Sequence, residues 1–388
     1  MSCRNRIFAF AVCAVGLAGA PLCAQWQILN SGTTADLRGI DNVGRGVAWA
    51  SGTNGTVLRT EDGGYLWQRC TVPAGAEKLD FRGIQGFDAN TAIVMSSGTG
   101  DLSRLYKTTD GCQTWKLVFT NPDKDGFWDA MKFADRQSGF LLGDPVGGSF
   151  VVMGTYDGGE HWIKARAISL EAEGSDSGVF AASNSSLLLS AKTNAPSFVT
   201  GGTHGAFFYG GLYQYGDHGK GGNTYCVAHA DPESSSTCIP SLLAFQVLPL
   251  PLSAKNASSG AFSIGSVGDL MQYRAVAVGG DYTKPALSDG TAVYLDRQFE
   301  GWLPAHAPPH GYRSAVAYDE AAKTWITVGP NGTDISTDDG RNWKAVHPDA
   351  ALNEAADADR GWNALSLPYV VGPHGRIGKL EFQPDERK

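Results

Sequence analysis

The sequence predicts an all-β fold, a seven-bladed β-propeller, from three observations. A turn motif of Thr or Ser, any residue, Asp, glycine and then Trp recurs four times, with its aspartates at Asp62, Asp110, Asp157 and Asp338. The first three aspartates are 48 and 47 residues apart, and the fourth follows after 181 residues, close to four further periods. A period in the forties is typical of propeller blades. The 50 glycines and the absence of helical periodicity agree with a single all-β domain.

The chain begins with a predicted secretory leader, residues 1–24. Two arginines precede an uncharged apolar run from Ile7 to Ala20, and small residues follow it. The run is shorter than the roughly 20 residues that a membrane-spanning helix needs. We therefore expect cleavage after Ala20 or Ala24, no transmembrane segment, and an exported protein that is periplasmic or extracellular.

Charge and cysteine content narrow the class of partner. The net charge is −8, and it becomes −10 without the two arginines of the leader, so no nucleic-acid partner is expected.

Four cysteines follow the leader, and an even number in an exported protein predicts two disulfides. Closeness in the sequence favours Cys70 with Cys112 and Cys226 with Cys238. The other two connectivities and free thiols stay open.

Each repeat is expected to contribute four strands. The first strand opens with a large or apolar residue, a variable residue, a small one and an aliphatic one, and the seven openings are at Leu37, Phe81, Trp128, Val179, Ala261, Tyr312 and Trp362. The second strand is an aliphatic run that ends in glycine, as in Val47–Gly52 and Trp325–Gly329. Continuous apolar runs of this kind indicate strands that are buried on both faces.

The turn motif joins the third strand to the fourth and is expected to be structural. Its Asp can accept backbone hydrogen bonds, its glycine allows a positive φ, and its Trp packs on the sheet. The last repeat reaches only three strands and ends near Arg376–Leu380. Trp26–Leu29 is expected to supply the missing fourth strand and so to close the ring.

Blade four lacks the turn motif. Its third strand is expected near Phe198–Gly202 and its fourth at Phe245–Leu248, with an insertion at about 203–243 inside the single propeller domain 25–388. The insertion holds Cys226, Cys238 and three histidines whose spacing fits no zinc template. No metal or other cofactor is expected.

A candidate site follows from the strand order. Because consecutive strands are antiparallel, the second residues of the first strands lie around one mouth of the channel, and they are Arg38, Arg82, Asp129, Phe180, Phe262, Arg313 and Asn363. The same order adds Asp144, Asp281 and Tyr282 to this face. Clustered arginines suit a carboxylate, a phosphate or an acidic peptide. The alternative is that each arginine pairs with a local carboxylate: Asp41, Asp129, Asp144 or Asp281.

The four turn motifs make the chain resemble the Asp-box, or BNR-repeat, propellers over nearly its whole length after the leader. It is most similar to bacterial relatives of the photosystem II assembly and stability factor, through its glycine-ended second strands, Gly279–Tyr282 and Gly311–Ser314. The resemblance implies an exported binding protein that recognises a membrane-protein partner with an arginine-rich face. Arg38, Arg82 and Arg313 are the corresponding candidates. The photosystem itself does not carry over, since nothing in the sequence indicates a photosynthetic host.

Sialidases share the turn motif and give a more distant, enzymatic resemblance. They bind the substrate carboxylate with three arginines and use a Tyr nucleophile, a Glu partner and an Asp acid. Here the expected Arg-Ile-Pro element is lacking, because Arg38 and Arg82 are each followed by Gly-Ile. Tyr282 and Tyr312 have no matching Glu nearby in the sequence. Because of these departures, the sequence favours a binding protein over a sialidase.

The sequence therefore predicts a monomeric, non-catalytic binding or assembly factor whose partner is a protein or an anionic ligand, carbohydrate included. The alternative is a glycoside hydrolase, of sialidase type or with paired carboxylates such as Asp129 with Asp144 or Asp281. A third possibility is that the blade-four insertion, residues 211–241, makes the contacts.

Overall fold

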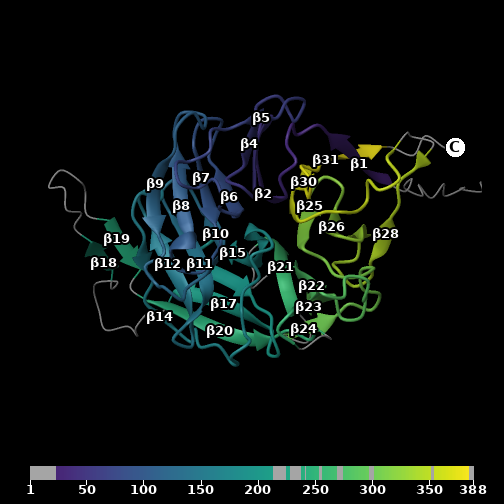
Figure 1. Cartoon of the computed structure of the whole chain (residues 1–388). Helices are drawn as coiled ribbons and strands as arrows, with labels where there is room; N and C mark the ends of the chain where they lie inside the picture. Colours follow the sequence, from purple (N-terminus) through teal and green to yellow (C-terminus); the bar gives the residue numbers. More distant parts are fainter. Residues whose placement is uncertain are drawn as a thin grey trace, which may run out of the picture.

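Seven sheets surround a central channel in the computed structural model, and the predicted seven-bladed β-propeller is confirmed (Figure 1). The structure describes residues 23–212, 224–227, 237–240, 242–252, 256–268, 274–296, 301–350 and 354–383. The predicted leader falls almost wholly outside these residues and stays a prediction. In the described part of the chain, no helix has the length and hydropathy that would let it cross a bilayer.

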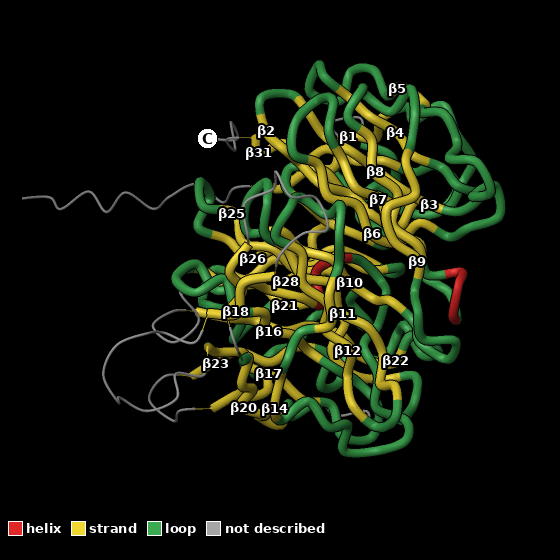
Figure 2. Tube along the Cα trace, turned by 90° about the vertical axis from the view of Figure 1, so that its left-hand side faces the viewer, coloured by secondary structure: helices red, strands yellow, loops and turns green. Residues whose placement is uncertain are grey.

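Five blades follow the expected plan of four antiparallel strands, ordered outward from the channel. Blades one to three consist of β2 (Leu37–Gly44), β3 (Val47–Gly52), β4 (Val57–Thr60) and β5 (Gln68–Arg69); β6 (Phe81–Gly86), β7 (Ala92–Ser96), β8 (Arg104–Thr108) and β9 (Lys116–Thr120); and β10 (Trp128–Phe133), β11 (Gly139–Val146), β12 (Ser149–Thr155) and β13 (Ile163–Lys164). Blades five and six consist of β21 (Ser259–Val267), β22 (Arg274–Asp281), β23 (Ala292–Asp296) and β24 (Gly301–Pro304); and β25 (Ala315–Asp319), β26 (Thr324–Gly329), β27 (Gly332–Ser336) and β28 (Lys344–Val346). Strands dominate the side view as well, with 3-10 turns such as η1 (Gly100–Leu102) as short red segments (Figure 2).

Blade seven joins the two ends of the chain. It consists of β29 (Ala364–Ser366), β30 (Tyr369–Val371), β31 (Ile377–Gln383) and the N-terminal β1 (Cys23–Leu29). The purple β1 lies beside the yellow β31 in Figure 1, antiparallel to it, with Trp26 opposite Leu380. The Trp26 ring is buried, packs 5.9 Å from the Trp362 ring, and donates a hydrogen bond of 3.1 Å to Thr333 Oγ1. The predicted closure by Trp26–Leu29 is confirmed.

Blade four departs from the prediction in its first and third strands. From the channel outward it has β15 (Leu187–Leu189), β16 (Pro196–Val199), β17 (Ala206–Leu212), β20 (Leu243–Pro249) and a parallel edge strand, β14 (Ala167–Ile168). The expected first strand at Val179 and third strand at Phe198–Gly202 are therefore wrong, whereas the fourth strand is confirmed.

Local turns explain these differences. The 3-10 turn η2 (Asn184–Ser186), capped by the Ser183 hydroxyl, occupies the residues before Leu187, so the innermost strand β15 begins later in the sequence than predicted. Gly202, with φ of +92°, helps to reverse the chain after β16, so the third strand is β17. The insertion consequently starts after Leu212 and not at about 203. It contains a hairpin of β18 (Thr224–Val227) and β19 (Thr237–Pro240).

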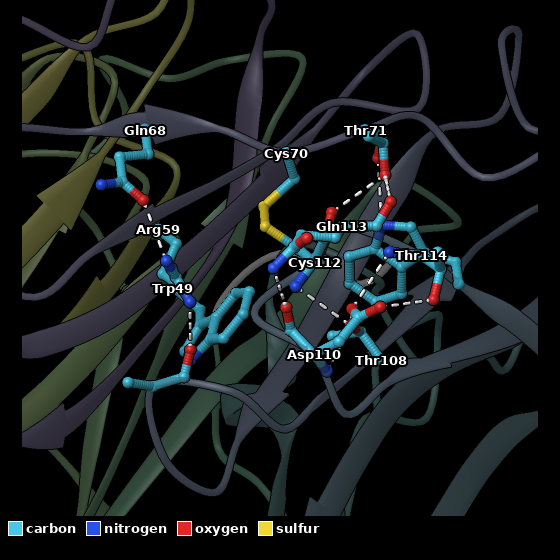
Figure 3. The surroundings of a disulfide bond; sticks show 12 residues. Trp49, Arg59, Gln68, Cys70, Thr71, Thr108, Asp110, Cys112, Gln113 and Thr114 are labelled. Carbon is cyan, nitrogen blue, oxygen red and sulfur yellow. Dashed lines mark hydrogen bonds between the residues drawn. A yellow bond between two sulfur atoms is a disulfide. The ribbon is translucent and has the colours of Figure 1, made fainter.

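One of the two predicted disulfides is present. Cys70, after the outer strand of blade one, is bonded to Cys112 in the turn motif of blade two, with the Cα atoms 5.3 Å apart (Figure 3). Beside it, the Thr71 hydroxyl donates 2.9 Å hydrogen bonds to the carbonyl oxygens of Cys112 and Gln113. Cys226 lies opposite Cys238 in the backbone register of β18 and β19. Their side chains lie outside the described residues, so that disulfide stays a prediction.

The turn motifs hold the outer ends of the blades by one recurring set of hydrogen bonds. In blade one, Thr60 Oγ1 donates to Asp62 Oδ1 at 2.9 Å and accepts from the Gly64 N–H at 3.0 Å, while Asp62 Oδ1 accepts from the Leu66 N–H at 3.0 Å. The equivalent bonds form at Asp110, Asp157 and Asp338. The structural interpretation of this motif is confirmed, because its carboxylates are occupied by their own turns.

Candidate functional site

The innermost strands of four blades begin with a β-bulge at the predicted channel mouth. The register shifts at the second residue of β2, β6 and β10 and at the fourth residue of β21, and the shifted residue has no partner in the next strand; these residues are Arg38, Arg82, Asp129 and Phe262. A β-bulge changes the direction of the side chain that it carries. The residue after the bulge must be small: a Cβ on Gly39 would lie 3.2 Å from the Arg82 carbonyl oxygen of the next blade. The opening pattern read from the sequence is thus the pattern of a bulge.

Arg38 and Arg82 converge on one carboxylate, Asp80. The Arg38 Nε atom lies 3.2 Å from Asp80 Oδ1, and Arg82 Nε donates a hydrogen bond of 2.8 Å to Asp80 Oδ2. Arg82 Nη1 also donates to the Ala181 carbonyl oxygen at 3.4 Å. Ala181 lies where the chain enters blade four, so this contact links blade two to blade four across the mouth, without a residue of blade three. Both guanidinium-bearing side chains stay 30% exposed.

Asp80 is the residue at this mouth that the sequence reasoning missed. The alternative had named Asp41, Asp129, Asp144 or Asp281 as arginine partners. Asp80 directly precedes β6, so its position before a strand opening was the available signal. Asp41 instead accepts hydrogen bonds from Gln85 Nε2 at 2.9 Å and from the Gly86 N–H at 2.8 Å.

The buried Asp129 and the half-buried Asp144 form a carboxyl pair beside Arg82. Both carboxyl oxygens of Asp129 are buried and have no hydrogen-bond partner among the described residues. Burial, and then the neighbouring Asp144 carboxylate, raise the pKa of Asp129 well above its usual value, while Arg82 opposes the shift. Asp144 Oδ1 accepts a hydrogen bond of 2.8 Å from the Val179 N–H, and burial raises the pKa of Asp144 to about 6. Asp129 therefore favours its protonated form, whereas Asp144 changes its protonation near pH 6, and a protonated Asp129 does not neutralise Arg82.

Arg313, the third arginine expected at the mouth, is fully buried and does not reach the mouth surface. Its side chain is fully buried and donates from Nε to Asp334 Oδ2 at 2.9 Å, with a second bond from Nη2 to the same oxygen. Its Nη1 donates to Asn331 Oδ1 at 2.7 Å. The residue precedes β25 instead of lying in a bulge, and the buried Asp334 in β27 neutralises it. Asp334, the one charged residue of β27, was the sequence signal of this ion pair.

Asp281 and Asn363 lie where predicted but are occupied by structural contacts. Asp281 is 2% exposed and accepts hydrogen bonds from the Thr283 hydroxyl and N–H and from the Ser258 hydroxyl. These bonds, that of the Thr283 hydroxyl foremost, lower the pKa of Asp281 to about 2. Asn363 Nδ2 donates to the Leu37 carbonyl oxygen at 2.8 Å and so ties blade seven to blade one.

Aromatic side chains cover the blade-four and blade-five side of the mouth. Phe180 and Phe262 stack with their ring centroids 3.9 Å apart and their planes 5° from parallel. Tyr282, which is 51% exposed, presents its ring edge-on at 6.2 Å from each. Tyr282 was predicted at this face; the stacking of the two phenylalanines was not, although both occupied mouth positions in the sequence pattern.

The fold and the mouth together define a seven-bladed β-propeller with a pair of partly exposed arginines, a protonatable carboxyl pair and an aromatic edge at one end of its channel. No family model and no curated protein matches the sequence. Similar solved structures include YCF48 bound to D1 peptide, at 15% identity and a TM-score of 0.57, covering 92% of this chain and 96% of that chain. YCF48 from Cyanidioschyzon merolae has 17% identity and a TM-score of 0.52, with 93% of this chain and 100% of that chain covered.

A GH74 xyloglucanase from Xanthomonas campestris is also similar, at 14% identity and a TM-score of 0.52, with 93% of this chain and 55% of that chain covered. At such identities the likeness concerns the fold alone. The same fold thus occurs in a structure with a bound peptide and in a xyloglucanase.

Proposed function

We propose that the protein is an exported, non-catalytic BNR-repeat propeller that binds an acidic protein segment at its channel mouth, as an assembly factor would. The observation that carries the proposal is the pair Arg38 and Arg82, held side by side by the single carboxylate of Asp80. A guanidinium group pairs with a carboxylate through parallel hydrogen bonds, so two of them on one carboxylate leave donors for a second.

The electrostatic surroundings support an anionic partner. The buried Asp129 has a pKa well above its usual value, so its protonation removes a negative charge that would otherwise neutralise Arg82, and the half-buried Asp144 loses its charge below about pH 6. Arg38 and Arg82, which share the one carboxylate of Asp80, thus keep positive charge at the mouth of a chain whose net charge is −8. Complementary charge of this kind directs the approach and the register of a partner.

A peptide is supported as the partner by fold similarity. YCF48 has the same fold and has a structure with a bound peptide. The resemblance of the sequence to photosystem II assembly factors agrees with this class of function. Export, through the predicted leader, would bring the propeller to envelope or extracellular partners.

The test is the joint replacement Arg38→Gln and Arg82→Gln, with Arg136→Gln as the matched control. Arg136 is also an exposed arginine paired with one carboxylate, Asp88, but it lies in the loop between β10 and β11 at the opposite end of the channel. Binding of fluorescent acidic peptides, followed by anisotropy, should weaken at least about 10-fold in the double variant, because charge-assisted hydrogen bonds are lost. The control variant should bind like the wild type. Unchanged binding by the double variant, with an unchanged Tm, would reject the site.

A glycoside hydrolase is the second candidate, favoured by the Asp129–Asp144 pair. A carboxyl group with a raised pKa beside a second carboxyl is the arrangement by which glycosidases separate the acid from the nucleophile or base. We place this function second because both carboxyl oxygens of Asp129 are buried, whereas a substrate must be able to reach the catalytic acid. If this candidate is correct, aryl glycosides should release their chromophore and Asp129→Asn should abolish the release. No release across a broad panel of glycosides would reject it.

A further inference from the structure

The aromatic cluster at the mouth, defined as Phe180, Phe262, Tyr282 and Tyr312, is built around a tightly seated ring. A Cβ on Gly201 would lie 2.1 Å from Phe180 Cε2, and one on Gly260 would lie 3.2 Å from the same atom. Gly201 also forms backbone bridges with Gly178 and Gly260. Glycine at these positions thus lets the backbones of blades four and five meet and leaves room for the Phe180 ring. The position of this ring is fixed by the fold.

The cluster is flanked by the arginines of the proposed binding site. Arg82 donates to the carbonyl oxygen of Ala181, the residue next to Phe180. On the other side, Tyr312 packs edge-on against Phe262 at 4.7 Å. Burial, and then the neighbouring Tyr282, raise the pKa of the Tyr312 phenol, and the Arg38 guanidinium partly opposes that rise. Positive charge and aromatic surface therefore adjoin at the same opening.

The accessible part of the cluster is limited in shape. Phe262 and Tyr312 are buried, Phe180 is partly buried, and Tyr282 is 51% exposed. Phe180 and Phe262 each cover one face of the other, and Phe262 is buried. What is left is an apolar corner between the exposed Tyr282 ring and the Phe180 ring. A corner of this kind suits a single apolar side chain.

We propose that the aromatic cluster is a second subsite, which takes a large apolar side chain of the same partner segment whose carboxylate pairs with Arg38 and Arg82. The inference rests on the proposed function and deepens it. It specifies the partner as a peptide in which an acidic residue is adjacent to an aromatic or large aliphatic residue. Tyr282 and Phe180 then determine specificity, and the arginines supply the charge recognition.

The experiment uses short Gly/Ser peptides that carry Phe-Asp, Ala-Asp or Phe-Asn at their centre, titrated against the full mature chain. The protein variants are Tyr282→Ala and Arg82→Gln, with Tyr65→Ala as the control. Tyr65 is a more exposed tyrosine, at 89%, in the turn motif of blade one at the other end of the channel. Tyr282 is exposed enough for its removal to leave the fold intact, which the Tm verifies.

The wild type should bind the Phe-Asp peptide about 3- to 10-fold more tightly than the Ala-Asp peptide, as expected for one aromatic contact. Tyr282→Ala should remove this preference and leave the affinity for Ala-Asp unchanged. Arg82→Gln should weaken both peptides, and Tyr65→Ala neither.

Each other outcome has a distinct meaning. Equal affinity for Phe-Asp and Ala-Asp, with both dependent on Arg82, would overturn the subsite and uphold the proposed function. Failure of every peptide to bind would contradict the proposed function and the subsite with it. A glucuronate oligosaccharide is titrated in the same way. If it binds more tightly than every peptide, and Tyr282→Ala abolishes its binding, the assignment of a peptide partner is overturned.

Discussion

Asp129 is a buried carboxyl group without a hydrogen-bond partner among the described residues, in a position where an ionised carboxylate would be costly. Burying a charge without a partner disfavours its ionised form. The nearest compensation is the Arg82 guanidinium, which is shared with Asp80. A carboxyl pair in such a setting is characteristic of sites that change protonation or contact a ligand.

Asp144→Asn should remove a pH dependence of stability that has a definite sign. Burial raises the pKa of the folded carboxyl from 3.8 to about 6, so the folded state binds the proton more tightly than the unfolded state. The resulting stabilisation is complete below about pH 4 and is lost as the pH rises through about 6. Between these limits the free energy of unfolding of the variant, relative to that of the wild type, should rise by about 1–3 kcal/mol.

Urea unfolding of both proteins from about pH 2 to about pH 7 measures the difference in the free energy of unfolding. Asp281→Asn serves as the control of opposite sign, because hydrogen bonding lowers the pKa of Asp281 to about 2. The stability lost in that variant should therefore grow as the pH rises from about 2 to about 4. A flat difference between the wild type and Asp144→Asn would contradict the assigned pKa.

For individual residues, the sequence predicts which side chains lie near the mouth better than it predicts which of them are exposed. Arg38, Arg82 and Asp129 lie at the mouth as expected, because the strand pattern alone determines where they fall. The burial of Arg313 depends on Asp334, which lies 21 residues later in another strand. The spacing of motifs does not reveal such a pairing.

Individual blades are stabilised by local turns and by links between neighbours. The turn motif satisfies its own backbone donors through Asp and Thr or Ser, and the buried tryptophans of blades one, three and six pack behind it. Blade four has no such motif and has a fifth, parallel strand instead. The sequence pattern at Val179 matched a strand opening, but the 3-10 turn that follows it is decided by serine and asparagine hydrogen bonds. Degenerate repeats are therefore where pattern matching fails.

Replacing both Cys70 and Cys112 with Ser should lower the free energy of unfolding. The disulfide closes a loop with a sequence separation of 42 residues between neighbouring blades. Removing a constraint of this size from the unfolded chain is expected to cost about 2–4 kcal/mol. Chemical denaturation measures the change, and wild type in reductant should match the double variant. Equal stability of the oxidised wild type and the double variant would show that the link does not stabilise the ring.

The whole ring depends on the closure of blade seven by a strand from the other end of the chain. The periodic spacing of the motifs predicted this closure, because seven repeats left one blade a strand short. The convergence of Arg38 and Arg82 from different blades is a consequence of the closed ring. The chemistry around them, including Asp80 and the stacked phenylalanines, comes from contacts between blades that the one-dimensional pattern does not encode.

Trp26→Ala should destabilise the molecule far more than Ile28→Ala in the same strand. The Trp26 ring is 3% exposed and contacts Trp362 and Thr333, whereas Ile28 is 39% exposed. Truncating a buried tryptophan costs about 3–5 kcal/mol, and the exposed site should cost about 0.5 kcal/mol or slightly more. Thermal and denaturant unfolding of the two variants measure this contrast. Similar small losses in both would mean that the ring holds without the closing strand.

Hydrogen exchange, with and without the Phe-Asp peptide, tests most directly whether the mouth is the binding surface. We expect the bound peptide to slow exchange around Arg38, Asp80–Arg82 and Phe180–Ala181, while the turn motifs at the other end of the channel keep their rates. Protection confined to the turn motifs or to the blade-four insertion, with none at the mouth, would contradict it.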